Sequence, residues 1–123
     1  MPRKKILLVD DSNTILMMER MILNKGPYEL VTASNGEEAI VKASTERPNL
    51  ILMDVVMPKM NGFEACRHIR NNEETRETPI IMVTTRGEAH NVENGFDSGC
   101  SDYVTKPING SELLTKVRNL LGE

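Results

Sequence analysis

The sequence predicts an α/β fold in which five parallel strands form one sheet and helices cover both of its faces. Short apolar runs alternate along the chain with longer stretches whose apolar residues recur every three or four positions, the pattern of buried strands followed by amphipathic helices. Strands that alternate with helices are joined by right-handed crossovers, which give a doubly wound parallel sheet. The 123 residues, 39% hydrophobic and 27% charged, fit a single globular domain over residues 1–123.

The predicted strands are mostly continuous apolar runs, as expected for strands buried on both faces. They span Lys5–Asp10, Tyr28–Ala33, Asn49–Asp54, Pro79–Thr84 and Ser101–Thr105. The five predicted helices span Asn13–Lys25, Gly36–Glu46, Gly62–Asn71, Glu88–Asp97 and Gly110–Leu121. Turn-forming pairs such as Asn61-Gly62 and Asn109-Gly110 fall between these elements, so the positions of the turn residues agree with the predicted boundaries.

Composition and charge argue against several classes of function. A net charge of -3 gives no general attraction for nucleic acid or for an anionic membrane. The chain contains no apolar run near the roughly 20 residues of a membrane span, and its N-terminus lacks the apolar region of a signal peptide. Cys66 and Cys100 lack the spacing of a zinc or redox motif. We therefore expect a cytoplasmic protein that binds neither nucleic acid nor membrane.

Polar residues stand where the predicted strands end. Asp10 and Asp11 close the first strand, Asp54 the third and Thr84 the fourth, and Lys106 follows the fifth. Because the carboxyl ends of parallel strands meet at one edge of a sheet, these side chains are expected to converge. Each aspartate taken alone is explained as a helix cap or turn residue. Their shared position favours a functional site instead.

The residue types at this edge suit phosphoryl transfer. Three carboxylates without nitrogen or sulfur ligands favour a hard cation, and Mg²⁺ in particular. An aspartate carboxylate can itself accept a phosphoryl group, while a lysine and a hydroxyl hold the phosphoryl oxygens. Asp54 is the better acceptor because it stands alone at the end of the central strand, whereas Asp10 and Asp11 can share the metal.

These residues resemble a response regulator receiver domain of the CheY-like single-domain type, and the resemblance covers the whole chain. It is carried, in order, by VDDS, LILMDVVMPKMNGFE, IIMVTT and DYVTKPI. It implies a flavodoxin-like sheet of strand order 2-1-3-4-5 and a receiver domain without an output domain. It also implies a monomeric signalling protein that is phosphorylated by a histidine kinase or phosphotransfer protein and then changes its affinity for an unidentified partner protein.

The resemblance assigns roles to the metal-binding residues and the phosphoacceptor. Asp54 matches the phosphorylated aspartate and Asp11 the direct Mg²⁺ ligand. Asp10 matches the carboxylate that assists largely through water, and the backbone carbonyl of Val56 matches the remaining protein ligand. Such a domain catalyses only its own phosphorylation and dephosphorylation, so it is not expected to be an enzyme in the usual sense.

The resemblance also assigns the switch. Thr84 matches the hydroxyl that binds the phosphoryl group, and Tyr103 matches the aromatic residue that turns inward when Thr84 moves. Lys106 matches the phosphate-paired lysine, and its bond to Pro107 matches the family's cis peptide. In the first helix, an exposed Ile15, Leu16 or Met17 is expected to contact the phosphodonor, while at least two of these residues are expected to serve in packing.

Two residues are expected to set the lifetime of the phosphorylated state. Val56 and Arg86 lie two positions after Asp54 and Thr84, close to where a water would attack the phosphoryl group. The valine forms no hydrogen bond and the arginine offers only donors, so neither can accept a proton from that water. Receivers with an amide and an acid at these places tend to lose phosphate faster, which predicts slow decay here.

Two other functions use the same fold. One is a Mg²⁺-dependent phosphohydrolase of small molecules, which the absence of a second aspartate two positions after Asp54 disfavours, since Val56 stands there. The other is a protein-binding scaffold that is never phosphorylated, which the complete set of acidic, hydroxyl and lysine residues disfavours.

Overall fold

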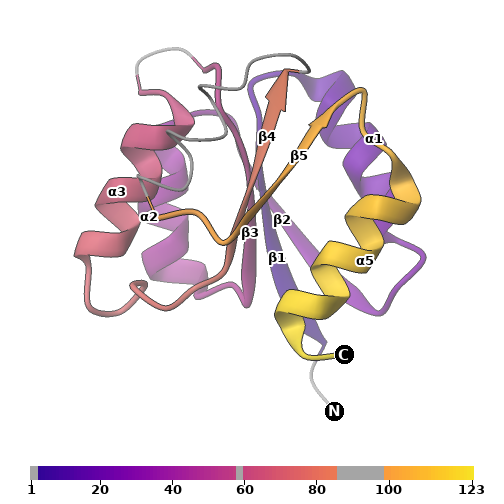
Figure 1. Ribbon diagram of the computed structural model, residues 1–123. Helices are drawn as coiled ribbons and strands as arrows, with labels where there is room; N and C mark the ends of the chain where they lie inside the picture. Colours follow the sequence, from indigo (N-terminus) through magenta and orange to yellow (C-terminus); the bar gives the residue numbers. More distant parts are fainter. Residues whose placement is uncertain (1–2, 58–59, 86–98) are drawn as a thin grey trace.

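A computed structural model describes residues 3–57, 60–85 and 99–123 and shows five parallel strands at its centre (Figure 1). The strands are ordered β2-β1-β3-β4-β5, as the resemblance implied. They are β1 Lys4–Val9, β2 Tyr28–Ala33, β3 Leu50–Asp54, β4 Ile80–Thr85 and β5 Asp102–Lys106. The helices of the described ranges are α1 Asn13–Leu23, α2 Gly36–Glu46, α3 Gly62–Asn71 and α5 Gly110–Leu121. The predicted helix Glu88–Asp97 falls outside these ranges.

The helices lie in two layers, with α1 and α5 on one side of the sheet and α2 and α3 on the other (Figure 1). We call these the α1/α5 side and the α2/α3 side. The α1/α5 side has a core that includes Leu8, Leu23, Leu52, Val83 and Val117. The α2/α3 side has a separate core that includes Val9, Met53, Phe63, Ile69 and Met82. Successive strand residues point to opposite faces, so every central strand contributes to both cores.

Each described helix begins in the same way. Ser12, Asn35, Asn61 and Asn109 are the N-cap residues, and each side chain accepts a hydrogen bond from the backbone N–H three positions on. These bonds satisfy one of the amide groups that a helix start leaves without an internal partner. At α3 the cap is reciprocal, because the Glu64 side chain also accepts from the Asn61 N–H. The chain therefore turns sharply from each strand end into the next helix.

The first helix is shorter than predicted. It was expected to reach Lys25 but ends at Leu23, with Asn24 as its C-cap. The Gly26 N–H donates to the Leu23 carbonyl at 3.0 Å, which closes a turn directly before Pro27. Proline disfavours a helical conformation in the residue that precedes it, so the helix stops before the Gly-Pro pair.

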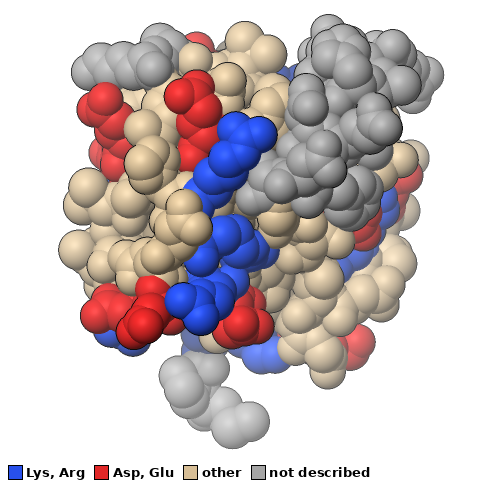
Figure 2. Space-filling view, turned by 60° about the vertical axis from the view of Figure 1, so that its left-hand side comes forward, with Lys and Arg blue, Asp and Glu red and all other residues tan. Residues whose placement is uncertain are grey.

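The surface over α3 carries charges of both signs. Figure 2 shows Lys and Arg side chains in a band on this face, with Asp and Glu side chains near both ends of the band. One ion pair of the α2/α3 side joins Arg47 Nη2 to Glu74 Oε2 at 3.1 Å. This face therefore carries a basic band that is flanked at its ends by acidic side chains.

The four described helices have 10 to 12 residues each. None of them is long and apolar enough to cross a membrane.

Candidate functional site

Strand alternation brings Asp10, Asp54 and Lys106 to one end of the α1/α5 side. Ile6 and Leu8 point into the core of that side, so Asp10, two positions further on, follows them on the same face. Leu50 and Leu52 lead to Asp54 in the same way, and Val104 leads to Lys106. The pairing of Leu8 with Leu52 sets Asp10 and Asp54 side by side at the strand ends. The convergence expected from the sequence is thereby present.

The three aspartates form a compact group. One carboxylate oxygen from each of Asp10, Asp11 and Asp54 lies within 4.8 Å of the others. Asp10 and Asp54 are almost fully buried, whereas Asp11 is exposed. Lys106 Nζ lies 3.1 Å from Asp54 Oδ1 and 3.8 Å from Asp10 Oδ2. The group is therefore buried at Asp10 and Asp54, open to solvent at Asp11, and paired with one ammonium among the described residues, that of Lys106.

Burial dominates the electrostatics of this group. Desolvation, together with the charge of Asp54, raises the pKa of Asp10 to about 6, although the hydrogen bond from the Ser12 N–H opposes the shift. Desolvation also raises the pKa of Asp54, and Lys106 opposes this shift. The pKa of Lys106 is raised although burial opposes it, because Asp54 and Asp10 stabilise the ammonium. One cation thus faces three acidic groups, which favours the binding of a second cation.

The residues present fit a Mg²⁺ ion. Their donor atoms are all oxygens, which suit a hard cation, and the exposed Asp11 leaves room for the waters that Mg²⁺ retains. Asp10 Oδ2 is buried and accepts no hydrogen bond within the described ranges. Its partner Oδ1 accepts from the Ser12 N–H at 2.9 Å. The site therefore contains carboxylate oxygens that still need a donor or a metal ion.

The two residues expected to act as the switch lie on β4, which neighbours the strand of Asp54, and on β5, one strand further along the sheet. Thr84 is buried, and its hydroxyl has no hydrogen-bond partner within the described residues. Tyr103 is half-buried and packs against the core of the α2/α3 side. Lys116 Nζ from α5 lies 4.9 Å from the centroid of the tyrosine ring. The peptide bond between Lys106 and Pro107 is cis, as the resemblance implied.

The two residues expected to set the lifetime cannot both be placed. The side chain of Val56 is 69% exposed, beyond the end of β3, so it lies in solvent rather than over the core. Arg86 falls outside the described residues.

Sequence reasoning missed one buried acid, Glu19, in the middle of α1. Its side chain is 1% exposed, and neither carboxyl oxygen has a hydrogen-bond partner in the described part of the chain. Desolvation raises its pKa to about 9, and the charges of Asp10 and Asp54 add to the shift. A signal was present in the sequence. The residues three and four positions away on either side are all apolar, namely Ile15, Leu16, Ile22 and Leu23, which sets Glu19 at the centre of the buried stripe.

The sequence and the fold of this chain are both similar to those of known proteins. The model of the response regulator receiver domain family matches residues 6–118. PhoP of Bacillus subtilis, an alkaline phosphatase synthesis transcriptional regulatory protein, is 40% identical over 118 residues; the match covers 96% of this chain and 48% of PhoP. Protein PilH of Pseudomonas aeruginosa is 37% identical over 117 residues, which cover 95% of this chain and 97% of PilH.

A solved structure with a metal ion is also similar. The receiver domain of sensor histidine kinase PA1611 from Pseudomonas aeruginosa, with a magnesium ion coordinated in its active-site cleft, superimposes with a TM-score of 0.91 at 30% identity and covers 99% of this chain and 100% of that one. The chain spans about half the length of the first curated relatives, such as PhoP, and nearly the whole of PilH. With its family match over most of its length, the chain belongs to the response regulator receiver domain family.

Proposed function

We propose that this chain is a phosphoacceptor of two-component signalling, with Asp54 as the residue that is phosphorylated. Receiver domains as a family act in such systems as signalling proteins rather than as classical enzymes. The observation that carries the residue-level proposal is the position of Asp54, a buried carboxylate paired to Lys106 at 3.1 Å and grouped with two further aspartates. The donor is a phosphohistidine of a histidine kinase or phosphotransfer protein.

In the proposed reaction, an oxygen of the Asp54 carboxylate forms a bond to phosphorus while the bond from phosphorus to the donor histidine nitrogen breaks. The Lys106 ammonium, held beside Asp54 by the ion pair, binds an oxygen of the incoming phosphoryl group. Asp10, Asp11, Asp54 and the Val56 carbonyl would hold Mg²⁺, which would supply positive charge for the phosphoryl oxygens. Positioning and charge neutralisation account for most of the catalysis of such transfers.

Thr84 and Tyr103 connect the phosphoryl group to the protein surface in this proposal. The Thr84 hydroxyl is buried and has no hydrogen-bond partner among the described residues, and a buried donor gains a hydrogen bond when a phosphoryl oxygen arrives within reach. A shift of Thr84 toward Asp54 vacates space beside β4, and Tyr103 on neighbouring β5 fills it. The surface around Tyr103 then differs between the two states, which changes its affinity for a downstream protein.

The exposed residues of α1 fit a contact with the phosphodonor. Met17 is 62% exposed and Met21 67% exposed, although both side chains are apolar. Ile15 and Leu16 are partly buried, and Leu16 packs against the core of the α1/α5 side. We therefore assign the outer face of α1 at Met17 to the donor protein, and Leu16 mainly to packing.

The experiment that tests this function is phosphorylation by acetyl phosphate, followed by intact mass spectrometry. With Mg²⁺, the wild type is expected to gain the mass of one phosphoryl group, and with chelator it is expected to gain none. Asp54→Asn is expected to stay unmodified in both conditions. Unmodified wild-type protein in Mg²⁺, or an equal gain by Asp54→Asn, would contradict the proposal. Multiple turnover of p-nitrophenyl phosphate would favour a phosphohydrolase instead.

A further inference from the structure

The aromatic ring of Tyr103 lies beside an ammonium group from α5. Lys116 Nζ is 4.9 Å from the centroid of the ring, within the roughly 6 Å over which the face of an aromatic ring attracts a cation. The Lys116 side chain is 24% exposed, so water screens this attraction less than it would at an open surface. The position of the ring in this structure is therefore stabilised by a cation–π contact.

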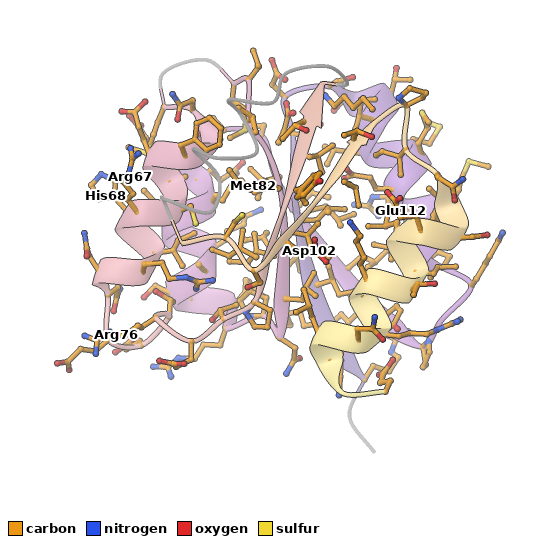
Figure 3. All side chains as sticks on the ribbon, viewed as in Figure 1. Arg67, His68, Arg76, Met82, Asp102 and Glu112 are labelled. Carbon is orange, nitrogen blue, oxygen red and sulfur yellow. The ribbon has the colours of Figure 1, made fainter. Side chains whose placement is uncertain are left out.

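The same ammonium is held by polar groups of β5. Lys116 Nζ donates a hydrogen bond to the Tyr103 carbonyl at 2.5 Å and lies 3.4 Å from Asp102 Oδ1. The same Asp102 oxygen accepts a hydrogen bond from the Tyr103 N–H at 2.8 Å, and Figure 3 shows Asp102 at the start of β5, beside α5. Hydrogen bonds with a charged partner are stronger than neutral ones. Lys116 and Asp102 therefore contact both backbone polar groups of Tyr103, and Lys116 contacts its ring as well.

The place of Lys116 follows from where Tyr103 stands in the sheet. β5 ends the strand order, so its outer side has no neighbouring strand within the described ranges, and edge strands present backbone groups that need other partners. The Tyr103 ring packs against the core of the α2/α3 side, whereas α5 lies on the other side (Figure 1). Its helix is anchored there by Leu113 and Val117, which are fully buried. Lys116 therefore reaches past the open edge of β5 to the ring.

A ring that turns inward leaves this ammonium behind. In the proposed function, Tyr103 turns toward the space that Thr84 vacates on β4. β4 adjoins β5 on the side opposite its open edge, so the turn carries the ring away from Lys116 Nζ, which the Tyr103 carbonyl and Asp102 keep at the edge. The cation–π contact thus belongs to one of the two ring positions. A contact made in only one of two states shifts the equilibrium toward that state.

We propose that Lys116 is a positioning residue of the switch: it holds the Tyr103 ring at the open edge of β5 and so sets how readily the ring turns inward. The inference rests on the proposed function, because it concerns the ring that responds to phosphorylation. A cation–π contact at a partly exposed place corresponds to a bias of about 2- to 5-fold between two states. Lys116 therefore favours the unphosphorylated form of the switch, and it does so from α5 rather than from the phosphoacceptor site.

Two substitutions separate the cation from the rest of the side chain. Lys116→Met keeps an apolar stem and removes the ammonium, whereas Lys116→Arg keeps a cation that can donate to the Tyr103 carbonyl and face the ring. Lys25→Met is the matched control, because Lys25 is an exposed lysine beyond α1. Three-bond NMR couplings across the first side-chain torsion of Tyr103 give the populations of its ring positions, in chelator and without phosphate. We expect the inward population to rise about 2- to 5-fold in Lys116→Met and to stay at the wild-type level in the other two variants.

A second NMR measurement requires no change at Lys116. Protons that lie over the face of an aromatic ring resonate upfield, so the ε-methylene protons of Lys116 should carry a ring-current shift in the wild type. The shift should persist in Tyr103→Phe, which keeps the ring, and disappear in Tyr103→Leu. Lys116 ε-protons at the frequency of an exposed lysine would contradict the inference, whatever the variants at position 116 show.

Two results for the ring populations would overturn the inference. Unchanged populations in Lys116→Met would show that the ammonium does not bias the ring, and equal changes in Lys116→Arg and Lys116→Met would show that a cation is not what holds it. A ring that keeps its position in protein phosphorylated by acetyl phosphate would overturn the switch assigned to Tyr103, and the inference with it. A wild type whose ring populations depend on Lys116 but which gains no phosphoryl group would support Lys116 as the residue that holds the ring and contradict the proposed function.

Discussion

The two sides of the sheet bury different kinds of residue. On the α2/α3 side, small side chains such as Ala39, Ala43 and Cys66 let the helices approach closely over a core of apolar residues. On the α1/α5 side, the core is also apolar, but at the carboxyl ends of the strands it meets three ionisable groups, Asp10, Asp54 and Lys106. Glu19 on α1 is buried on the same side. The same alternation of strand residues supplies both sides, yet the ionisable groups Asp10, Asp54 and Lys106 gather on the α1/α5 side.

The difference indicates how this fold divides its tasks. Unpaired acids lower the stability of the metal-free protein, and they are confined to one end of one side. The close-packed side fixes where β3 ends, since the Gly62 N–H at the start of α3 donates to the Val55 carbonyl at 2.9 Å. A rigid α2/α3 side therefore holds Asp54 in place while the α1/α5 side carries the electrostatic cost.

The largest expected effect comes from adding a methyl group at the first residue of a helix. Gly36, Gly62 and Gly110 each follow an asparagine N-cap. A Cβ on Gly62 would lie 2.2 Å from the Asp54 carbonyl oxygen, and one on Gly36 would lie 2.8 Å from the Met60 carbonyl oxygen. On Gly110 the nearest atom would be Ile22 Cγ1 at an ordinary 3.5 Å.

We therefore expect the cost of a Gly→Ala change to follow the packing of the two sides. In urea unfolding, Gly62→Ala should lose about 3 kcal/mol or more and Gly36→Ala about 1–2 kcal/mol. Gly110→Ala should stay within about 0.5 kcal/mol of the wild type, because the methyl group meets Ile22 only at ordinary van der Waals distance and stiffens the unfolded chain. Equal losses at all three positions would show that the two sides do not differ in tightness.

The next largest effect is a dependence of stability on pH that arises on the α1/α5 side. An acid whose pKa is higher in the folded state binds its proton more tightly there, so its contribution favours folding at low pH and is lost as pH rises. For Glu19 this window runs from its ordinary 4.5 to about 9, and for Asp10 from 3.8 to about 6. Glu38, whose pKa is lowered, acts in the opposite sense only as pH falls toward 4.5 and below.

In chelator, the free energy of unfolding should therefore be about 2 kcal/mol larger near pH 5.5 than near pH 7, at roughly 1.4 kcal/mol per pH unit for one proton. Glu19→Gln should remove most of this dependence. A wild type whose stability stays constant or rises from pH 5.5 to pH 7 would show that the buried acids are ionised in the folded state.

A smaller effect is expected from neutralising single aspartates. In chelator, Asp54→Asn should raise the melting temperature by roughly 3–6 °C, the shift that about 1 kcal/mol produces in a domain of this size. Asp11→Asn should raise it less, because Asp11 is exposed and Asp54 is buried. Both variants should bind Mg²⁺ more weakly. Loss of stability in both would contradict the view that the acids repel one another in the metal-free protein.

The sequence predicted most of this organisation because the fold follows from periodicity. The observed bounds of β2, α2, α3 and α5 equal the predicted ones, since each is delimited by a turn or an asparagine cap that can be read directly. The convergence of Asp10, Asp54 and Lys106 followed from parallel strands alone. Distances, burial and ion pairing did not, because they depend on how strands and helices pack.

Helix α1 shows where sequence reasoning failed. Its apolar run Ile15–Met18 was expected to be buried only in part, and a glutamate between Met18 and Arg20 gave no reason to expect burial. In the structure Met17 and Met21 are more than half exposed, in keeping with partial burial of the run, but Glu19 is buried. Charge was a poorer guide than the helical spacing, which the neighbours three and four positions away would have provided.

The smallest expected effect concerns how long the phosphoryl group persists. We propose that Val56, which is 69% exposed beyond β3, and Arg86 leave the attacking water without an acceptor. The double variant Val56→Asn with Arg86→Glu should lose its phosphoryl group several-fold faster than the wild type, since general-base assistance and water positioning lower the barrier. Decay is followed by intact mass after removal of acetyl phosphate. Unchanged decay would remove these two side chains from the account.

The central claim, that the charged row of the α1/α5 side is a phosphoacceptor centre built on Asp54, is tested most directly by locating the phosphoryl group. Reduction of an aspartyl phosphate with borohydride converts the residue to homoserine, which peptide mass spectrometry can assign to a position. After treatment with acetyl phosphate and Mg²⁺, we expect homoserine at position 54 and at no other aspartate. Homoserine at position 10 or 11, or none in a protein that binds Mg²⁺, would contradict the account.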